Sequence, residues 1–443
     1  MTVTHSTRYG DLAPAQPYLE QYDRVKAELP GAALSWVRDL RELGRSRFAE
    51  LGFPTTKVEA WKYTSLKTLE KVAFQPAKPA AAGVHFDVLP HVGTGPRLVF
   101  VDGFYRADLS SAAGVPAGVE LMGLAEALTR QPDLVGEHLG RLAVSDEQRF
   151  VALNTAFLAD GAVVRIGRGV EVAEPIELVF VSLGSDDGPV AFHPRTLLIA
   201  GAQSKATVIE HHVGLGLGAT FANHVAEAYV GEGAILRHYK VQREGAEAFH
   251  LSNSVARVGK DACYDNFILT TGARLARNEV RVALGLGSSC NVNGAYMVGG
   301  HQHCDTTTVI EHREPHGTSR EVYKGAIDDH ARAVFQGKIV VHPGAQKTDG
   351  HQLNRALLLS DTAEIDAKPE LEIYADDVKC SHGATAGELA DEALFYLRAR
   401  GIPKDEARAL LIGAFLSEAL DEIHEEPVRE AFQGFVSGWL NAR

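Results

Sequence analysis

Between residues 162 and 373 the hydrophobic side chains occur in short runs that are rich in Val and Ile and end at Gly or Asp. Typical runs lie at residues 162–166, 176–181 and 195–199. No helical period of useful length interrupts them, and short turn-bounded runs of this composition are typical of β-strands. The pattern predicts a continuous β region that is longer than a single β-sandwich commonly uses.

A weak internal repeat suggests how these strands are arranged. The turns at residues 231–234, 259–262 and 285–288 each begin with Gly and end with a small residue, and they start 28 and then 26 residues apart. Later turns at Gly344-Ala345 and Thr362-Ala363 resemble them. A turn that recurs at this spacing favours a β-solenoid, in which each coil stacks only on its neighbours. A propeller and a large jelly roll are the alternative architectures.

The chain before residue 160 has a more helical pattern. We expect a flexible tail over residues 1–16, two helices over 17–51 that are broken at Pro30-Gly31, a linker over 75–95, a buried strand over 97–105 that ends in a turn, and helix over 119–160. The segment 52–64 combines polar and aromatic residues, and either a packed connector or a docking segment fits it.

Helical patterns return near the C-terminus. We expect a helix over 391–400 that is stopped by Gly401, a second that starts at Pro403, and a third from Pro427. On the second helix Leu410, Leu411, Ala414 and Phe415 fall on one apolar stripe. These helices could cap one end of the solenoid, or the stripe could receive a partner protein, and both roles can coexist.

Composition narrows the function classes. The 443 residues include 57 acidic and 44 basic side chains, a net charge of −13, which argues against a broad surface for nucleic acid or anionic membrane. No apolar run approaches the length of a membrane span, and the N-terminus does not resemble a secretory signal. Four cysteines without a CxxC pair favour a reducing cytoplasm over a disulfide scaffold or a structural zinc site.

No convincing catalytic motif is present, and we predict that the chain is not an enzyme. It has no GxSxG, Walker A or HExxH motif, so an ATP-driven process would need another subunit. A β-solenoid carbohydrate-active enzyme is a rival reading that requires paired carboxylates, for which Asp328/Asp329 and Asp376/Asp377 are the candidates. A second candidate group of metal ligands is His301, His303, Cys304 and Asp305 with His312 and His316, but we favour a strand with exposed histidines, because Cys304 lies on the opposite face from His301 and His303.

The strongest candidate site is Cys380 with His382. The two residues are two positions apart, so on an extended strand they share one face and present a thiol and an imidazole together, a pair that suits a soft or borderline metal ion such as iron. Lys379 is expected to favour the thiolate. A buried thiol and a hydrogen-bonded core histidine are the alternative interpretation.

A dense string of motifs in the last third carries a family resemblance. It comprises residues 320–325, 335–340, 346–349, 352–354, 357–360, 371–373, 376–385, 394–397, 400–402 and 407–408, with His303, Asp305, Thr308 and His312 upstream. Together they resemble the SufB/SufD family, the scaffold subunits of the SUF iron–sulfur cluster assembly system. Residues 54–64, and the lack of an N-terminal cysteine cluster, are similar to the SufD branch. Ala386 is a small departure from the family pattern.

The resemblance implies a fold with three regions. These are an N-terminal helical region with a linker over 1–160, a right-handed parallel β-helix core over 161–375, and a C-terminal helical region over 376–443. The implied function is a scaffold that pairs with a SufB-like subunit and a SufC-like ABC-type ATPase, the latter docking on residues 386–443, here through Leu410, Leu411, Ala414 and Phe415.

The resemblance also bears on the site. It places Cys380 and His382 near the interface with the SufB-like subunit, as candidate ligands of a transient iron–sulfur cluster rather than of a permanent cofactor. A structural partner without iron ligands is the alternative, and the isolated chain could be a homodimer.

Overall fold

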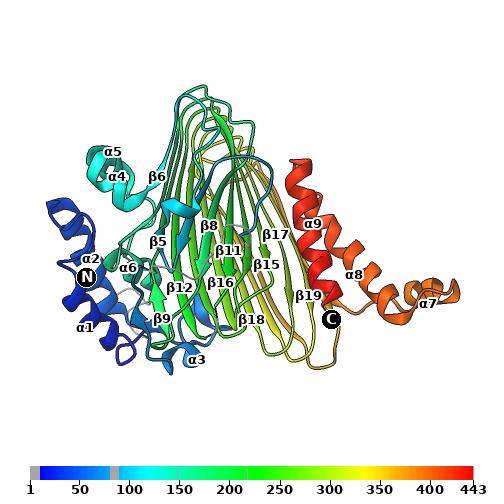
Figure 1. Ribbon diagram of the computed structural model, residues 1–443. Helices are drawn as coiled ribbons and strands as arrows, with labels where there is room; N and C mark the ends of the chain where they lie inside the picture. The colour runs from blue at the N-terminus through cyan, green and yellow to red at the C-terminus, as the bar shows by residue number, and fades with distance from the viewer. Residues whose placement is uncertain (1–9, 80–88, 147, 217, 443) are drawn as a thin grey trace.

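The computed structural model describes residues 10–79, 89–146, 148–216 and 218–442, and its central feature is a pair of long β-sheets (Figure 1). From β10 onward successive strands alternate between the two sheets, and strands within a sheet run parallel. One sheet contains β7 Gly161–Ile166, β9 Val190–Phe192, β10 Arg195–Ala200, β12 Thr220–Val230, β14 Phe249–Val258, β16 Leu275–Leu284, β18 His303–His312, β20 Arg332–Val341 and β22 Glu364–Ile373. The other contains β8 Ile176–Ser182, β11 Lys205–Gly214, β13 Ile235–Arg243, β15 Cys263–Thr270, β17 Ser289–Val298, β19 Thr318–Ile327, β21 Asp349–Leu358 and β23 Lys379–Gly387. This is a parallel β-solenoid of about eight turns, as predicted, and not a propeller or a jelly roll.

The repeated glycines mark the edge where the chain passes from the first sheet to the second. The amide N–H of Gly231 donates to the carbonyl of Ala200 at 2.8 Å, and Gly259 makes the equivalent bond to Val230 at 2.8 Å. A Cβ atom on Gly231 would lie 2.7 Å from the amide nitrogen of Ala202, so only glycine allows this approach. Gly344-Ala345 lies on the same edge as these turns, as expected. Thr362-Ala363 lies on the opposite edge, so the prediction that it is an equivalent turn is wrong.

The inside of the solenoid has an apolar part and a polar part. Alternate residues of each strand face inward because side chains of a strand alternate between its two faces. Toward the glycine edge the inward residues are apolar, for example Ala228, Val230 and Leu236. Toward the opposite edge they include Glu210 and His224, both fully buried.

The two helical regions lie on opposite sides of the solenoid (Figure 1). The N-terminal side has α1 Gln16–Val25, α2 Ser35–Leu51, α3 Lys67–Glu70, α4 Leu124–Arg130, α5 Pro132–His138 and α6 Arg149–Ala156, with the short strands β1 Gly10–Asp11, β2 Phe53–Pro54 and β3 Gln75–Pro76 and the 3₁₀ turns η2 Glu59–Trp61 and η4 Ala107–Leu109. The break at Pro30-Gly31 falls between α1 and α2 as expected. Residues 52–64 are a packed connector, because Phe53 and Trp61 are buried in an aromatic cluster with Phe150 and Phe221. The expected tail and linker lie partly outside the described residues.

The prediction of helix over residues 119–160 is wrong for residues 119–123. They form the strand β6 Val119–Gly123 rather than helix, and β6 pairs antiparallel with β7. On the other sheet β5 Phe104–Tyr105 pairs antiparallel with β4 Arg97–Val101, which matches the predicted strand and turn. The antiparallel strands β5 and β6 are the last strands of the two sheets at the first coil.

The other end of the solenoid is open. Strands β22 and β23 are the last strands of their sheets, and each has a neighbour on one side only within the described chain. We call this pair the last coil. Strand β23 extends to Gly387, so residues expected in the helical C-terminal region continue the solenoid.

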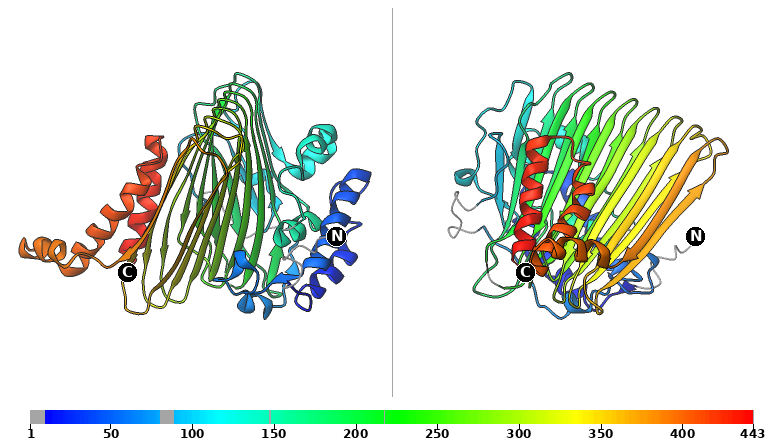
Figure 2. Two further views of the ribbon diagram at one scale, coloured as in Figure 1. Left: turned by 180° about the vertical axis from the view of Figure 1, so that it is seen from behind. Right: turned by 90° about the vertical axis from the view of Figure 1, so that its right-hand side faces the viewer.

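The C-terminal helices do not cap the open end, contrary to one expectation. Helices α7 Asp391–Ala399, α8 Lys404–Leu420 and α9 Glu426–Asn441 begin and end close to the predicted positions. Leu416 and Phe432 pack with Tyr239, Phe267 and Met297 on the outer face of the second sheet. Figure 2, right, shows α8 and α9 lying across the strands rather than over the last coil. No helix among the described residues is long and apolar enough to cross a membrane.

Candidate functional site

Cys380 and His382 lie on β23, in the last coil. In the parallel register Cys380 is opposite Gly350 and His382 is opposite Gln352 of β21. Gly350 and Gln352 are buried, inward-facing positions of β21, so Cys380 and His382 point into the same interior space. Because no coil follows β23, His382 is exposed to solvent while Cys380 is half-buried. The structure therefore places a thiol and an imidazole side by side at the mouth of the solenoid.

The surroundings of Cys380 make its thiol less acidic. Cys380 packs against a small buried apolar cluster of Ile339, Val341, Ala345 and Ala375. Burial raises the pKa of the Cys380 thiol above its ordinary value of 9.0 and the nearby Asp349 carboxylate raises it further, against a hydrogen bond with the backbone of Gly350. Lys379 points to the other face of the strand and does not favour the thiolate, so that expectation is wrong.

Cys380 and His382 provide two ligands and no more. In the described part of the chain, neither residue belongs to a group of three His, Cys, Asp or Glu side chains close enough to hold one metal ion. Iron in iron–sulfur clusters is ordinarily held by four protein ligands per cluster. A cluster at this position would need the remaining ligands from a second protein chain.

The structure separates the other candidate ligands. His303 Nε2 lies 2.9 Å from the Thr64 hydroxyl, and His312 Nε2 lies 2.8 Å from the Ser319 hydroxyl inside the solenoid. His301 stacks on His330, whereas Cys304 is buried in an apolar cluster. His316 lies in a turn with φ of 61°. These side chains form no common metal site.

The two aspartate pairs are also far from the arrangement that a glycosidase needs. Asp328 and Asp329 lie in the turn between β19 and β20, while Asp376 and Asp377 lie in the turn between β22 and β23. Each pair therefore lies in a turn at an edge of the solenoid, and neither pair lies on the strand face of a groove, where a β-solenoid carbohydrate-active enzyme would need its two carboxylates.

Helix α8 carries the predicted apolar stripe, but the stripe is divided between two faces. Leu410 is 50% exposed and Ala414 is exposed, whereas Leu411 and Phe415 are half-buried. The residues that anchor α8 on the solenoid are Ala407, Ile412, Leu416, Ala419 and Leu420. Phe415 belongs partly to this anchor, because the ammonium of Lys324 lies 4.4 Å from its ring centre. Leu410 and Ala414 remain on the outer side.

Helix α7 adds more exposed apolar surface next to α8. None of its residues is buried, and Phe395 and Tyr396 are 75% and 56% exposed. Figure 1 shows α7 projecting away from the solenoid. We call Phe395, Tyr396, Leu410 and Ala414 the outer helix surface. Large apolar side chains that are exposed in this number on adjoining helices are typical of a protein interaction site.

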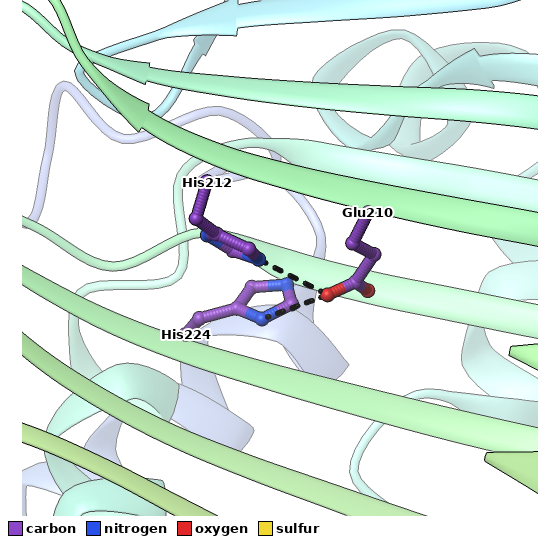
Figure 3. Close-up of side chains that lie close together, drawn as sticks. All are labelled: Glu210, His212 and His224. Atoms are coloured by element: carbon purple, nitrogen blue, oxygen red, sulfur yellow. Dashed lines mark hydrogen bonds and ion pairs between the residues drawn. The ribbon is translucent and has the colours of Figure 1, made fainter. Parts of the chain in front are cut away.

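The structure also contains a buried polar cluster that the sequence did not reveal. Glu210 and His212 of β11 and His224 of β12 point toward one another between the sheets (Figure 3). His212 Nε2 lies 3.1 Å and His224 Nδ1 lies 3.6 Å from the same carboxylate oxygen of Glu210. Glu244 and His250 form a second group with His212. We call these five residues the inner cluster. The sequence held one clue to this cluster: Glu210 and His212 are two positions apart on one strand, so their side chains lie on the same face.

Burial affects which side chains of the inner cluster are charged. Burial lowers the pKa of His212 to about 4, although the hydrogen bond to Glu210 opposes this shift. Burial alone would raise the pKa of Glu244, but His250 and His212 lower it to about 2. Glu244 is therefore ionised and His212 neutral at physiological pH, which leaves an imidazole with a free electron pair beside a carboxylate.

Comparison with known proteins gives consistent matches over most of the chain. The family model described as the SufBD core domain of SUF system FeS cluster assembly matches residues 181–415, and the model of the SufBD protein N-terminal region matches residues 13–178. The chain is 34% identical over 381 residues to the iron–sulfur cluster assembly protein SufD of Escherichia coli K12, over 86% of this chain and 87% of that protein.

Two further relatives extend the comparison. An iron–sulfur cluster assembly SufBD family protein of Synechocystis is 33% identical over 416 residues, which cover 90% of each chain. Protein ABCI7 of Arabidopsis thaliana, named as chloroplastic, is 28% identical over 424 residues, which cover 93% of this chain and 87% of that protein.

Proposed function

Because this chain belongs to the SufBD family of the SUF iron–sulfur cluster assembly system, we propose that it acts as a SufD-type scaffold that pairs with a SufB-type subunit and a SufC-type ATPase. As a member of that family it is an iron–sulfur cluster assembly protein and not an enzyme. The complex would build or transfer a nascent cluster, which is its cargo rather than a resident cofactor.

The open last coil is the observation that carries the pairing. Among the described residues, no strand pairs with the outer edge of β22 or of β23, so each leaves one row of backbone N–H and C=O groups without a strand neighbour. A long unprotected edge is ordinarily covered in native proteins, and solenoid ends need a cap. Ile373 and Tyr374 are 41% and 61% exposed beside this edge. A SufB-type subunit that docks here would cover both the edge and the apolar side chains.

The same contact would complete the ligand set at Cys380 and His382. Two ligands alone hold iron weakly, but a partner that brings further donors to the mouth of the solenoid would make a closed site. Docking would also remove His382 from water. A dry interface strengthens the interaction between the ligands and a charged cargo.

The outer helix surface is the proposed docking site for the ATPase. It is apolar and accessible, and α7 projects away from the solenoid (Figure 1). We place the complex in the cytoplasm, since all four cysteines are free thiols, as a reducing compartment requires.

Co-purification tests the pairing. The tagged chain is co-expressed with SufB-type and SufC-type subunits from the same source, and the recovered partners are quantified. Ile373→Glu should reduce recovery of the SufB-type subunit by about tenfold, since it places a charge in an apolar contact. Leu43 is 47% exposed on the distant helix α2, so Leu43→Glu is a matched control that should change nothing. Equal recovery with both variants would refute docking at the last coil.

Size measurements on the isolated chain test the remaining alternative. If a second copy covers the open end when no SufB-type subunit is present, the isolated chain should be a homodimer. Ile373→Glu should then convert it to a monomer, while Leu43→Glu should not.

A further inference from the structure

The inner cluster lies far from the last coil, in the coils made by β11, β12, β13 and β14, and no role has been assigned to it so far. Glu210, His212 and His224 are 0%, 2% and 0% exposed. Both imidazoles turn a nitrogen toward one oxygen of Glu210 (Figure 3). The 3.6 Å from His224 Nδ1 to that oxygen is too long for a hydrogen bond. The carboxylate and this ring thus face each other without a hydrogen bond between them.

Several polar atoms around this carboxylate lack a hydrogen-bond partner. They are Oε1 of Glu210, Nδ1 of His224 and Nε2 of His238, all in fully buried side chains. His238 Nε2 lies 3.0 Å from Glu210 Oε1 but outside hydrogen-bond geometry. Native proteins pair nearly all buried polar atoms, because an unpaired one loses its hydration without compensation. One unpaired carboxylate oxygen with two unpaired imidazole nitrogens beside it is an arrangement that a positively charged partner would complete.

One proposed ligand, His224, and the neighbouring His238 are also held in the manner of metal-ligating histidines. His224 Nε2, on the far side of the ring, lies 2.9 Å from the hydroxyl of Thr196. His238 Nδ1 lies 3.0 Å from the hydroxyl of Tyr264. In metal sites the second nitrogen of a ligating histidine is usually held by such a neighbour, which fixes the ring and leaves the first nitrogen free.

We propose that Glu210, His212 and His224 bind one divalent first-row transition metal ion inside the solenoid. Metal–ligand bonds of about 2.1 Å place adjacent ligand atoms about 3.0–3.4 Å apart. The distances of 3.1 and 3.6 Å from the Glu210 oxygen to the two imidazoles are close to that range. Two imidazoles and one carboxylate are a ligand set that suits Fe(II) and Zn(II).

The second triad of the cluster is less suited to an ion. Both oxygens of Glu244 already accept hydrogen bonds, one from His250 at 2.7 Å and one from Gln242. A metal there would have to displace these bonds. In the Glu210 triad a metal would displace only the bond between His212 Nε2 and Glu210 Oε2, while Nδ1 of His224 and Oε1 of Glu210 have no partner among the described residues.

Lys240 is the group that competes with a metal ion. Its ammonium lies 3.5 Å from the same oxygen of Glu210 and donates to the hydroxyl of Ser252 at 2.6 Å. An ammonium this close to the Glu210 carboxylate would weaken the binding of a dication by repulsion.

The test measures metal on the full chain without any partner subunit. Because the site is buried, the ion must enter as the chain folds. The protein is unfolded with a chelator, refolded with either Fe(II) under anaerobic conditions or Zn(II), freed of excess metal and analysed by mass spectrometry. We expect about one equivalent in the wild type, and less than about a tenth in Glu210→Gln and His224→Gln. His312, a buried histidine elsewhere in the same interior, gives the control His312→Gln, which should keep the ion.

Two further measurements do not remove a ligand, so their results cannot be explained by misfolding of the ligand variants. Lys240→Met should tighten binding of Zn(II) by about tenfold, because it removes a nearby positive charge without removing a ligand. Co(II) refolded into the wild type should show absorption bands of nitrogen and oxygen coordination. If refolded wild type and Lys240→Met both carry less than about a tenth of an equivalent of either metal, the proposal is wrong and Lys240 alone neutralises Glu210.

Dependence on different residues would also overturn the proposal. If His250→Gln removed the ion and His224→Gln kept it, the assigned triad would be incorrect. Since the chain is tested alone, none of these results depends on the proposed pairing with SufB-type and SufC-type subunits.

Discussion

Leu410 and Leu416 lie on opposite faces of α8: Leu416 is fully buried against the solenoid, whereas Leu410 is 50% exposed. We therefore expect the two leucines to respond differently to substitution. Leu410→Glu should leave the midpoint of thermal unfolding unchanged and reduce co-purification with the SufC-type ATPase by about tenfold. Leu416→Ala should lower the free energy of unfolding by about 2–5 kcal/mol, because it opens a cavity between α8 and the sheet.

The control for Leu410→Glu is Leu43→Glu, a change of the same kind at a similarly exposed site on the far side of the molecule. It should keep full ATPase recovery. If both variants lost the ATPase to the same degree, added negative charge in general would be responsible, and the outer helix surface would have no special role.

We expect substitution of alanine for glycine to destabilise the protein at Gly325 but not at Gly344. A Cβ atom on Gly325 would lie 1.8 Å from Cε2 of Tyr296, which is fully buried and donates a hydrogen bond to Asn354 at 3.2 Å. Gly325→Ala should therefore cost about 1–3 kcal/mol of unfolding free energy through overpacking. Gly344→Ala meets no atom within 4 Å and should change stability by less than about 0.5 kcal/mol. Denaturant midpoints measure both, and equal midpoints would mean that the coils relax around Tyr296.

Much of the fold could be predicted because its cause is local and repeated. The Gly-small turns recur wherever neighbouring coils approach closely, and the backbone contact at Gly231 is the physical reason. Strand β6 was missed because its pattern is short and its partner β7 lies some forty residues later, so no local period reports the pairing. Helix α8 has Leu, Ile or Ala on nearly every side, so its sequence could not distinguish the buried face of Leu416 from the exposed face of Leu410.

The sequence also predicted the candidate sites only as far as their causes are local. Alternation along β23 was sufficient to place Cys380 and His382 on one face. The thiol pKa depends on burial and on Asp349 of the neighbouring strand β21, which the local sequence around Lys379 does not report, and the effect expected of Lys379 was wrong for that reason. Glu210 and His224 meet only because β11 and β12 belong to facing sheets, and the sequence gives no register between sheets.

Acid should unfold the protein partly through its buried histidines. Burial lowers the pKa of His193 from 6.5 to about 3 in the folded state. Between these values the unfolded chain binds a proton that the folded chain does not, so stability falls as pH drops below 6.5. At pH 5 the loss from His193 alone is about 2 kcal/mol. Urea midpoints at pH 7.5, 6 and 5 measure the slope.

His193→Gln is the variant that checks this assignment. Gln can still accept the hydrogen bond that Asn223 donates at 3.2 Å, but it does not titrate. The urea midpoint of this variant should fall less steeply with acid than that of the wild type. An unchanged slope in His193→Gln would refute the prediction.

The thiol of Cys380 should react slowly with iodoacetamide. Its pKa is raised by burial, so less thiolate is present at pH 8 than in a free peptide of the same sequence. Peptide mass spectrometry at several pH values should show a rate that continues to rise above pH 9. Cys263, whose pKa is raised to about 11, is the internal comparison and should react more slowly still. A Cys380 rate equal to that of the free peptide at pH 8 would contradict the raised pKa.

The last prediction concerns iron at the mouth of the solenoid. We expect the complex of this chain with SufB-type and SufC-type subunits to assemble normally with His382→Ala, because His382 is exposed on the edge strand and supports no packing within the chain. After anaerobic reconstitution with Fe(II) and sulfide, the variant complex should carry less iron and sulfide than the wild type, since one ligand is missing. His330→Ala, an equal change at a distant turn, should load as the wild type does.

The pattern of losses separates a ligand from a packing residue. If His382 only packs against the partner, His382→Ala should lower complex yield and cluster content together. If it is a ligand, cluster content should fall while the recovered complex keeps its stoichiometry and size. Cys380→Ser distinguishes the same two roles for the thiol, because Ser fills nearly the same volume but is a poor ligand for iron. Normal iron content in an intact His382→Ala complex would remove His382 from cluster binding and leave the last coil with an interface role alone.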